Sequence, residues 1–317
     1  MGKRIGIDVG GTNVKIALVD EKGKIIYSNS VPTYAKMGYE YTVNNIKQSI
    51  RDLMKETRTD EKTIEAIGFD FPGQVDYKKG IVKLAPNIPG WVNVPIAKMI
   101  EDEFHIPTRI DNDVRCAALG ELNFGAGKGC ENFVCITVGT GIGSGLVING
   151  KLVRGASNAA GEIGHIKLVA KDGAICGCGD TGCLEAYASG PSIVAMAQDY
   201  IKGGKSTKFR ELAGVDAEIT PYLVAKAAEA GDPVAKRIFE IMGEYIGLGL
   251  TSVVNLLNPE KIIIGGGVAE SGELLLAPIR KTIKERAMVI AGEAVEIVPA
   301  QLGNSAGVIG ASMLIDE

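Results

Sequence analysis

Short apolar runs, separated by glycine-containing turns, dominate the start of the chain. Three of these runs are predicted to be strands of a β-meander: Lys3–Ile7, Val14–Val19 and Lys24–Tyr27. The next segment, Tyr39–Glu56, has apolar residues at spacings of three and four and is therefore predicted to form an amphipathic helix. The pattern changes from strand to helix within one segment of chain, which favours an α/β protein.

Both patterns continue to the end of the chain. Further strands are predicted at Ala66–Phe71, Thr108–Ile110 and Lys261–Ile264. Each of these strands ends at a turn, and the three turns are Pro72-Gly73, Asp111-Asn112-Asp113 and Gly265-Gly266-Gly267. Helices are predicted at Pro95–Phe104, Val114–Leu122, Ser192–Lys202, Pro221–Ala230, Pro233–Leu257, Ser271–Arg286 and Ser305–Leu314.

One pattern occurs twice. Ile7-Asp-Val-Gly-Gly-Thr12 aligns without a gap on Ile136-Thr-Val-Gly-Thr-Gly141, and each copy lies between two apolar strands. The second copy closes at Asn149-Gly150, a strong two-residue hairpin signal. Two such units imply two similar α/β domains that face a cleft. We place the smaller domain at residues 1–116, completed by the C-terminal helix at 305–317, and the larger domain at 117–304.

Composition narrows the class of protein. A chain of 317 residues with 46% hydrophobic content suits about two globular domains. The net charge of −4 and the lack of long basic runs argue against nucleic acid as the main partner. Apolar runs stay shorter than the roughly 20 residues of a membrane span, and no secretory signal is recognisable. We therefore expect a cytoplasmic protein with no membrane partner.

A cluster of thiols and one imidazole is the strongest chemical signal. His165 is followed by Cys176, Cys178 and Cys183, which is the Cys₃His set that a structural zinc prefers. Disulfides and buried thiols are the alternatives, and a reducing compartment disfavours the former. Glu162 and Glu185 flank the cluster, so the metal is predicted to shape a polar site; with four protein ligands it does not activate water. The remaining cysteines are interpreted as core thiols: Cys116, Cys130 and Cys135.

Three strand ends carry glycine turns: Gly10-Gly11, Gly139–Gly145 and Gly265–Gly267. Glycine allows backbone N–H groups to converge on an anion, so the three turns together favour nucleotide binding. The Walker pattern is absent, and a strand follows Gly139-Thr-Gly141-Ile-Gly143 where a dinucleotide fold needs a helix. A β-hairpin phosphate binder is the remaining interpretation.

With these motifs in place, the chain resembles the ROK family of sugar kinases. The motifs that carry the resemblance are Asp8-Val-Gly-Gly-Thr, Thr137-Val-Gly-Thr-Gly-Ile-Gly, Gly161-Glu-Ile-Gly-His165, the Cys-x-Cys-Gly-x-x-Gly-Cys-x-Glu run and Ile264-Gly-Gly-Gly267. The resemblance implies a two-domain, actin-like or hexokinase-like ATPase fold of the ribonuclease H-like type, with an inter-domain cleft. It also implies ATP-dependent phosphorylation of a hexose, Mg²⁺ beside the ATP, zinc in the Cys₃His site, and a homodimer or homotetramer.

The resemblance assigns Asp113 as the general base that orients and deprotonates the attacking hydroxyl. The alternative is that Asn112 or Asp113 caps the helix that follows, and both readings are compatible. The residues expected around the sugar are Gly73, Asn87, Asn112, Asp113, Glu162, His165 and Glu185.

On the nucleotide side, the resemblance assigns Asp8 to Mg²⁺, directly or through water. The residues expected around ATP are Asp8, Gly10, Gly11, Thr12, Asn13, Lys15, Thr137, Gly139, Thr140, Gly141, Gly265, Gly266 and Gly267. For Lys15 the alternative is a solvated strand lysine.

The choice of sugar rests on one segment. Asn158-Ala-Ala-Gly161-Glu162 lacks the proline that fructose-directed members tend to carry and looks more like kinases of glucose and N-acetylmannosamine. Glucose, phosphorylated at its 6-hydroxyl, is the expected substrate and N-acetylmannosamine the second. ATP is preferred to polyphosphate because polyphosphate-using relatives usually lack the cysteine cluster. A sugar-responsive repressor without its DNA-binding region and an actin-like structural ATPase are the alternatives from other classes.

Overall fold

The computed structural model describes residues 2–85, 88–214 and 218–317. Its contacts divide the chain into two compact units: residues 1–131, 145–160 and 301–317 form the first, and residues 132–144 and 161–300 form the second. The sequence-based division placed residues 117–131, 145–160 and 301–304 in the second domain, whereas the contacts assign them to the first unit.

The first unit is built on a five-stranded sheet in the order β3-β2-β1-β4-β8. Its strands are β1 (Lys3–Val9), β2 (Asn13–Asp20), β3 (Ile25–Pro32), β4 (Ile64–Phe71) and β8 (Thr108–Asn112). The meander β1–β3 is antiparallel, as predicted, and β4 and β8 run parallel to β1. A small sheet, also in this unit, was not predicted and consists of β5 (Gln74–Asp76), β6 (Ile81–Leu84) and β7 (Val92–Val94).

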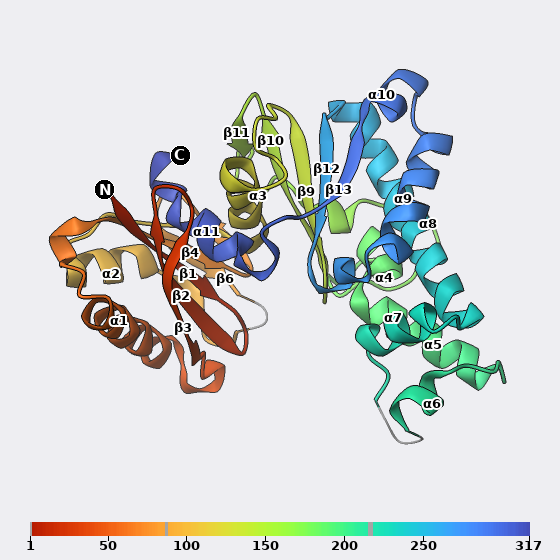
Figure 1. Ribbon diagram of the computed structural model, residues 1–317, viewed down its shortest axis with the longest axis horizontal. Coiled ribbons are helices and arrows are strands. Elements are labelled where there is room, and N and C mark those ends of the chain that lie inside the picture. The colour runs from red at the N-terminus through yellow and green to blue at the C-terminus, as the bar shows by residue number, and fades with distance from the viewer. Residues whose placement is uncertain (1, 86–87, 215–217) are drawn as a thin grey trace. The chain divides into compact units, whose positions relative to one another are not determined.

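Helices cover both faces of this sheet (Figure 1). On one face, α1 (Tyr39–Glu56) and α2 (Ile96–Phe104) bury their apolar stripes against alternate residues of the strands. On the other face lie α3 (Asp113–Phe124) and α11 (Ala306–Ser312). The predicted C-terminal helix therefore does pack on the N-terminal sheet, and it can approach closely because Gly6 and Gly68 have no side chain there: a Cβ on either would lie within 2 Å of an α11 carbonyl oxygen.

A second five-stranded sheet has the order β11-β10-β9-β12-β13. Its strands are β9 (Phe133–Val138), β10 (Ile142–Ile148), β11 (Lys151–Val153), β12 (Lys261–Gly265) and β13 (Glu296–Pro299). The order matches that of the first sheet, with β9 and β10 in the places of β1 and β2, so the predicted repeat is confirmed. Asn149 and Gly150 both have positive φ, 51° and 71°, as the predicted tight hairpin turn requires.

The remaining helices belong to the second unit. They are α4 (Leu184–Ala188), α5 (Gly190–Lys202), α6 (Phe209–Ala213), α7 (Pro221–Glu229), α8 (Pro233–Leu257), α9 (Glu273–Arg286) and α10 (Val289–Ala294). The helix α8 has the predicted bounds, and its N-cap Asp232 accepts hydrogen bonds from the Val234 and Ala235 N–H groups. Short 3₁₀ turns are η1 (Ala35–Met37), η2 (Glu61–Thr63), η3 (Ile163–His165), η4 (Gly267–Ser271), η5 (Gly303–Ser305) and η6 (Leu314–Asp316). Among the described residues, no helix combines the length and apolarity needed to cross a membrane.

Candidate active site

Three carboxylates lie in one row across the first sheet. Asp8 on β1 pairs with Asp70 on β4, and Asp70 pairs with Asp111 on β8. The residue before each of them belongs to the core beneath α1 and α2, so alternation directs all three carboxylates toward the face that α3 and α11 cover. Asp8 is a predicted site residue, whereas Asp70, which lies within the buried part of β4, was not predicted.

Asp113 is the first residue of α3 and lies two residues after Asp111, the last carboxylate of this row. The helix is capped by Asn112, whose Oδ1 accepts a hydrogen bond from the Val114 N–H at 3.1 Å. The Asn112 amide nitrogen donates to the Gly73 carbonyl at 3.3 Å. The structure therefore brings together three predicted sugar-site residues of this unit, Gly73, Asn112 and Asp113, and gives the capping role to Asn112. Asn87, predicted with them, lies outside the described residues.

The acidic groups influence one another. Burial raises the pKa of Asp113 to about 6, and the Asp8 carboxylate adds to the rise, while the Val114 N–H opposes it. The pKa of Asp8 is also raised by burial, and the Lys15 ammonium opposes this effect. Burial, with the charges of Asp8, Asp113 and Asp111, raises the pKa of Asp70 well above its usual range. Asp113 is thus half-ionised near pH 6, close to the range in which a general base works well.

The first predicted glycine turn joins β1 to β2. The Gly10 N–H donates to the Asn13 carbonyl at 2.9 Å, and Gly11, Thr12 and Asn13 are exposed. The Lys15 Nζ donates to the Asn304 carbonyl at 3.0 Å and to the Ser305 hydroxyl at 3.2 Å, so this lysine has hydrogen-bond partners within the unit. The exposed residues of this turn therefore lie just beyond the end of β1.

The other two glycine turns lie side by side in the second unit. Gly265, at the end of β12, pairs with Thr137 near the end of β9. Gly266 has a φ of 88°, and a Cβ there would lie 2.5 Å from the Val138 carbonyl oxygen, so glycine is required. The β9–β10 turn is closed by the Gly139 N–H, which donates to the Gly141 carbonyl at 2.9 Å, and Thr140 at its tip is exposed.

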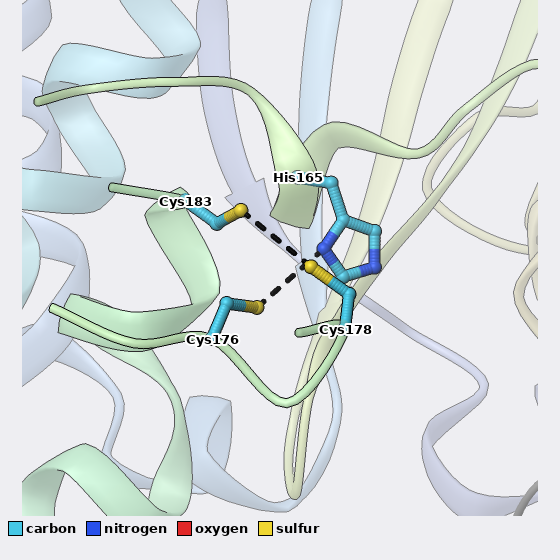
Figure 2. A group of neighbouring side chains, drawn as sticks. All are labelled: His165, Cys176, Cys178 and Cys183. Carbon is cyan, nitrogen blue, oxygen red and sulfur yellow. Dashed lines mark hydrogen bonds between the residues drawn. The ribbon is translucent and has the colours of Figure 1, made fainter. Parts of the chain in front are cut away.

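His165, Cys176, Cys178 and Cys183 come together as predicted (Figure 2). Their ligand atoms lie within 4.8 Å of one another. The Cys176 sulfur is 3.7 Å from the His165 Nδ1 atom, and the Cys178 and Cys183 sulfurs are 3.8 Å apart. A tetrahedral zinc with Zn–S bonds of about 2.3 Å needs ligand separations of about 3.8 Å, so this donor set fits zinc. The cysteines predicted to be core thiols are buried: Cys116, Cys130 and Cys135.

Local structure explains how the chain forms this cluster. The turn η3 presents His165, and an isolated bridge between Lys167 and Cys183 aligns the two ends of the intervening loop. A second bridge, between Ile175 and Thr181, closes the loop further along. Cys183 immediately precedes α4. The cluster therefore joins the two ends of the loop that runs from η3 to α4.

The two flanking carboxylates differ in their surroundings. Glu185, on α4, accepts a hydrogen bond from the Ile142 N–H at 2.9 Å, so it also supports the β9–β10 turn. Its other oxygen lies 3.5 Å from the Cys176 sulfur. Glu162 is exposed, and within the described part of the chain its side chain has no recorded partner. Glu162 is thus the carboxylate with its full hydrogen-bonding capacity available for a ligand.

Comparisons with known proteins show the family of this chain. The model of the ROK family matches residues 4–317. The glucokinase of Halalkalibacterium halodurans is 36% identical over 313 residues, which are 99% of this chain and 94% of that protein. The xylose repressor of Caldicellulosiruptor bescii is 33% identical over 319 residues, which are 99% of this chain and 78% of the repressor.

A solved structure of a ROK family protein also matches this chain over almost its whole length. The ROK family glucokinase from Streptomyces griseus, in complex with glucose and AMPPNP, is 38% identical and superposes with a TM-score of 0.84, with 99% of each chain covered. The predicted α/β fold of the actin-like, hexokinase-like ATPase class is thereby confirmed.

Proposed function

Because this chain belongs to the ROK family, we propose that it transfers the γ-phosphate of ATP to the 6-hydroxyl of glucose. The class of the enzyme, a hexokinase-type phosphotransferase, follows from its full-length similarity to glucokinases. The observation that carries the choice of glucose is this similarity together with the solved relative that holds glucose and AMPPNP. The identity of the sugar in this chain is part of the proposal.

In the proposed mechanism, Asp113 accepts the proton of the attacking hydroxyl. Its raised pKa, about 6, leaves it mostly ionised at neutral pH while making it a stronger base than an ordinary aspartate. Its backbone is fixed on both sides, by the Asn112 cap and by the first turn of α3. Most of the rate enhancement is assigned to positioning and to charge stabilisation, as is usual for phosphoryl transfer.

ATP is proposed to bind at the glycine turns of both units. Exposed N–H groups around Gly11 and Thr12 would face the phosphates, with Thr137, Gly139, Thr140 and Gly141 contributing from the second unit. Gly266 and Gly267 would lie along the adenosine. Asp8 supplies carboxylate oxygens, which suit Mg²⁺, and when bound this ion would neutralise charge on the phosphates.

The sugar is proposed to bind Asn112 in the first unit and Glu162, His165 and Glu185 in the second. Carboxylate and amide groups suit vicinal hydroxyls, because each hydroxyl both donates and accepts. Zinc in the Cys₃His cluster would have four protein ligands and no open position, so its contribution would be structural. Function requires that both units act on the same pair of substrates, and this is part of the proposal.

The compartment and the assembly are also part of the proposal. Reduced thiols in a metal cluster suit the cytoplasm, where ATP is also available. A homodimer or homotetramer is proposed from membership of the family.

A coupled assay with ATP and five sugars tests the substrate: glucose, mannose, fructose, N-acetylglucosamine and N-acetylmannosamine. We expect glucose to give the highest kcat/KM. A higher kcat/KM for N-acetylmannosamine would replace glucose by the second candidate. Sugar binding without turnover of any of the five would instead favour a sugar-responsive regulator, a possibility that the similarity to a xylose repressor makes specific.

A further inference from the structure

A buried arginine on α3 makes hydrogen bonds that have no part in the proposed mechanism. Arg115 lies two residues after Asp113, and only 4% of its side chain is exposed. Its Nη1 atom donates to Asp111 at 3.2 Å, and its Nη2 atom donates to the carbonyls of Asn158 at 2.8 Å and Ala160 at 3.0 Å. One guanidinium thus joins the strand that precedes α3 to a distant loop within the same unit.

Helix stability does not explain this arginine. A cation in the first turn of a helix opposes the helix dipole, which favours negative charge at that end. Burial of the guanidinium adds a desolvation penalty, and its Nε has no hydrogen-bond partner among the described residues. The Asp111 carboxylate, fully buried, offsets part of this penalty, but it already has a second cationic partner in Arg154 at 2.7 Å.

The loop that Arg115 holds has little regular structure of its own. Gly155, Asn158 and Gly161 all have positive φ, at 73°, 59° and 96°. The Ala160 N–H donates to the Arg154 carbonyl at 3.0 Å, whereas the Asn158 N–H makes only a long bond of 3.4 Å. Two carbonyls of the loop depend on Arg115, and the chain then runs directly through Gly161 into Glu162.

The same hydrogen bonds reach the proposed base. Asp111 Oδ1, which accepts from Arg115, also accepts from the Asn112 N–H at 2.8 Å. Asn112 in turn caps the helix that begins at Asp113. A continuous path therefore links the backbone beside the base to the backbone before Glu162, and Arg115 is its central member.

We propose that Arg115 is a positioning residue for the sugar site, which sets the backbone of residues 158–160 and thereby the presentation of Glu162. This inference rests on the proposed function for its kinetic consequence. Glu162 lies two residues beyond the second carbonyl that Arg115 holds, so release of that carbonyl affects how the sugar is bound. Asp113 keeps its place because Asn112 and Asp111 remain.

The test compares Arg115→Met with Arg115→Lys and with a control, Arg109→Met. Methionine keeps much of the length and loses all donors. Lysine keeps the charge toward Asp111 but lacks the fork that bonds a carboxylate and two carbonyls together. Arg109 is an exposed arginine on β8 that donates a hydrogen bond to the Thr108 carbonyl. Its replacement removes the same charge as Arg115→Met but leaves the hydrogen bonds to the loop at residues 158–160 intact.

For Arg115→Met we expect the KM of the sugar to rise at least about tenfold while kcat changes by less than about threefold and the KM of ATP stays constant. Arg115→Lys should show an intermediate KM, and Arg109→Met should match the wild type. Hydrogen exchange of the peptide that covers residues 155–163 should be faster in Arg115→Met, whichever sugar is the substrate.

The outcomes separate the two proposals. If the wild type phosphorylates none of the hexoses, the proposed function fails, and the exchange experiment still decides whether Arg115 orders the loop. If the wild type is active and folded Arg115→Met keeps its sugar KM within about twofold, the positioning role is overturned. Should Arg115→Met fail to fold, the same criteria apply to Arg115→Lys.

Discussion

At the scale of the residue, the structure gives the capping role to Asn112 and leaves the Asp113 side chain for the proposed chemistry. The sequence allowed either Asn112 or Asp113 to cap the following helix, and the structure assigns the cap to Asn112. The Asp113 carboxylate is held among other acidic groups with a raised pKa, which is unfavourable for folding at neutral pH. Sites that carry such strain are often functional.

Asp113→Asn should separate stability from activity. Because the pKa of Asp113 is raised in the folded state, to about 6, its contribution to stability is greatest below the unfolded value and is lost as the pH rises through 6. Asparagine should therefore raise the free energy of unfolding at pH 8 by up to about 3 kcal/mol and by little below pH 4. Turnover should fall by orders of magnitude, with sugar affinity largely retained.

Urea unfolding at the two pH values and steady-state kinetics measure both effects. The wild-type kcat/KM should also fall as the pH drops below about 6, because a protonated Asp113 cannot accept a proton. Asp199→Asn, at an exposed position on α5, is the control and should change neither. Near-normal turnover of Asp113→Asn would remove this residue as the base.

Single site residues could be predicted from the sequence where the residue types and their spacing indicated the same kind of site. The Cys₃His set could be recognised because its ligands are rare residue types at short spacing. Asp70 could not be recognised, because its importance comes from strand register: it is the residue opposite Asp8 and Asp111, and register is a long-range property. Arg115 was missed for the same reason, since its partners lie 43 and 45 residues away.

At the scale of the element, long periodic segments were predicted well and short ones were missed. The helix α1 has the predicted bounds because its apolar stripe repeats over several turns. The strands β5, β7 and β11 have only three residues each, too few for any period to be visible. The strand β8 extends past its predicted end to Asn112, because Asp111 is paired with the buried Arg115 and the partly buried Arg154 and can therefore continue a buried strand.

Cys178→Ala should test whether the metal cluster stabilises the loop between η3 and α4. Loss of one thiolate should release zinc and lower the thermal stability of the second unit, because the loop between the two elements, described throughout, contains no helix and only two isolated bridges. Since His165 is both a proposed metal ligand and a proposed sugar ligand, the KM for the sugar should rise as well. Metal analysis, calorimetry and kinetics are the measurements.

Cys130→Ala is the matched control, because Cys130 is a buried thiol outside the cluster. It should retain zinc and the wild-type KM. A Cys178→Ala protein that has lost zinc yet keeps its sugar KM would show that the metal does not support the sugar site. Full zinc content in Cys178→Ala would remove this cysteine from the ligand set.

At the scale of the whole molecule, the two sheets have the same strand order, which corresponds to the internal repeat predicted from the sequence. The repeat lies in contiguous strand–turn–strand motifs, which sequence comparison detects directly. The boundaries depend on which segments return to which unit. Residues 145–160 and 301–317 both belong to the first unit. The return of the C-terminal helix was predicted from the sequence, whereas the assignment of residues 145–160 depends on tertiary contacts.

Glu121 attaches the C-terminal segment, residues 301–317, to the rest of the first unit. It is a fully buried carboxylate on α3. Its Oε1 atom accepts hydrogen bonds from the N–H groups of Gln301 at 2.9 Å and Leu302 at 2.8 Å, the residues at which the chain re-enters the first unit. Its Oε2 atom accepts from the Ala126 N–H at 2.7 Å. Both carboxylate oxygens are needed to satisfy these buried donors.

Glu121→Gln should therefore destabilise the protein although the two side chains have nearly the same shape. Glutamine has one acceptor oxygen, and its NH₂ group would face a backbone N–H that needs an acceptor. We expect a loss of about 2–4 kcal/mol in the free energy of unfolding, measured by urea titration. Glu56→Gln, at an exposed position at the end of α1, should change it by less than about 0.5 kcal/mol. If the two variants were equally stable, the attachment of the C-terminal segment would depend on the packing of α11 against the glycines of the sheet and not on this carboxylate.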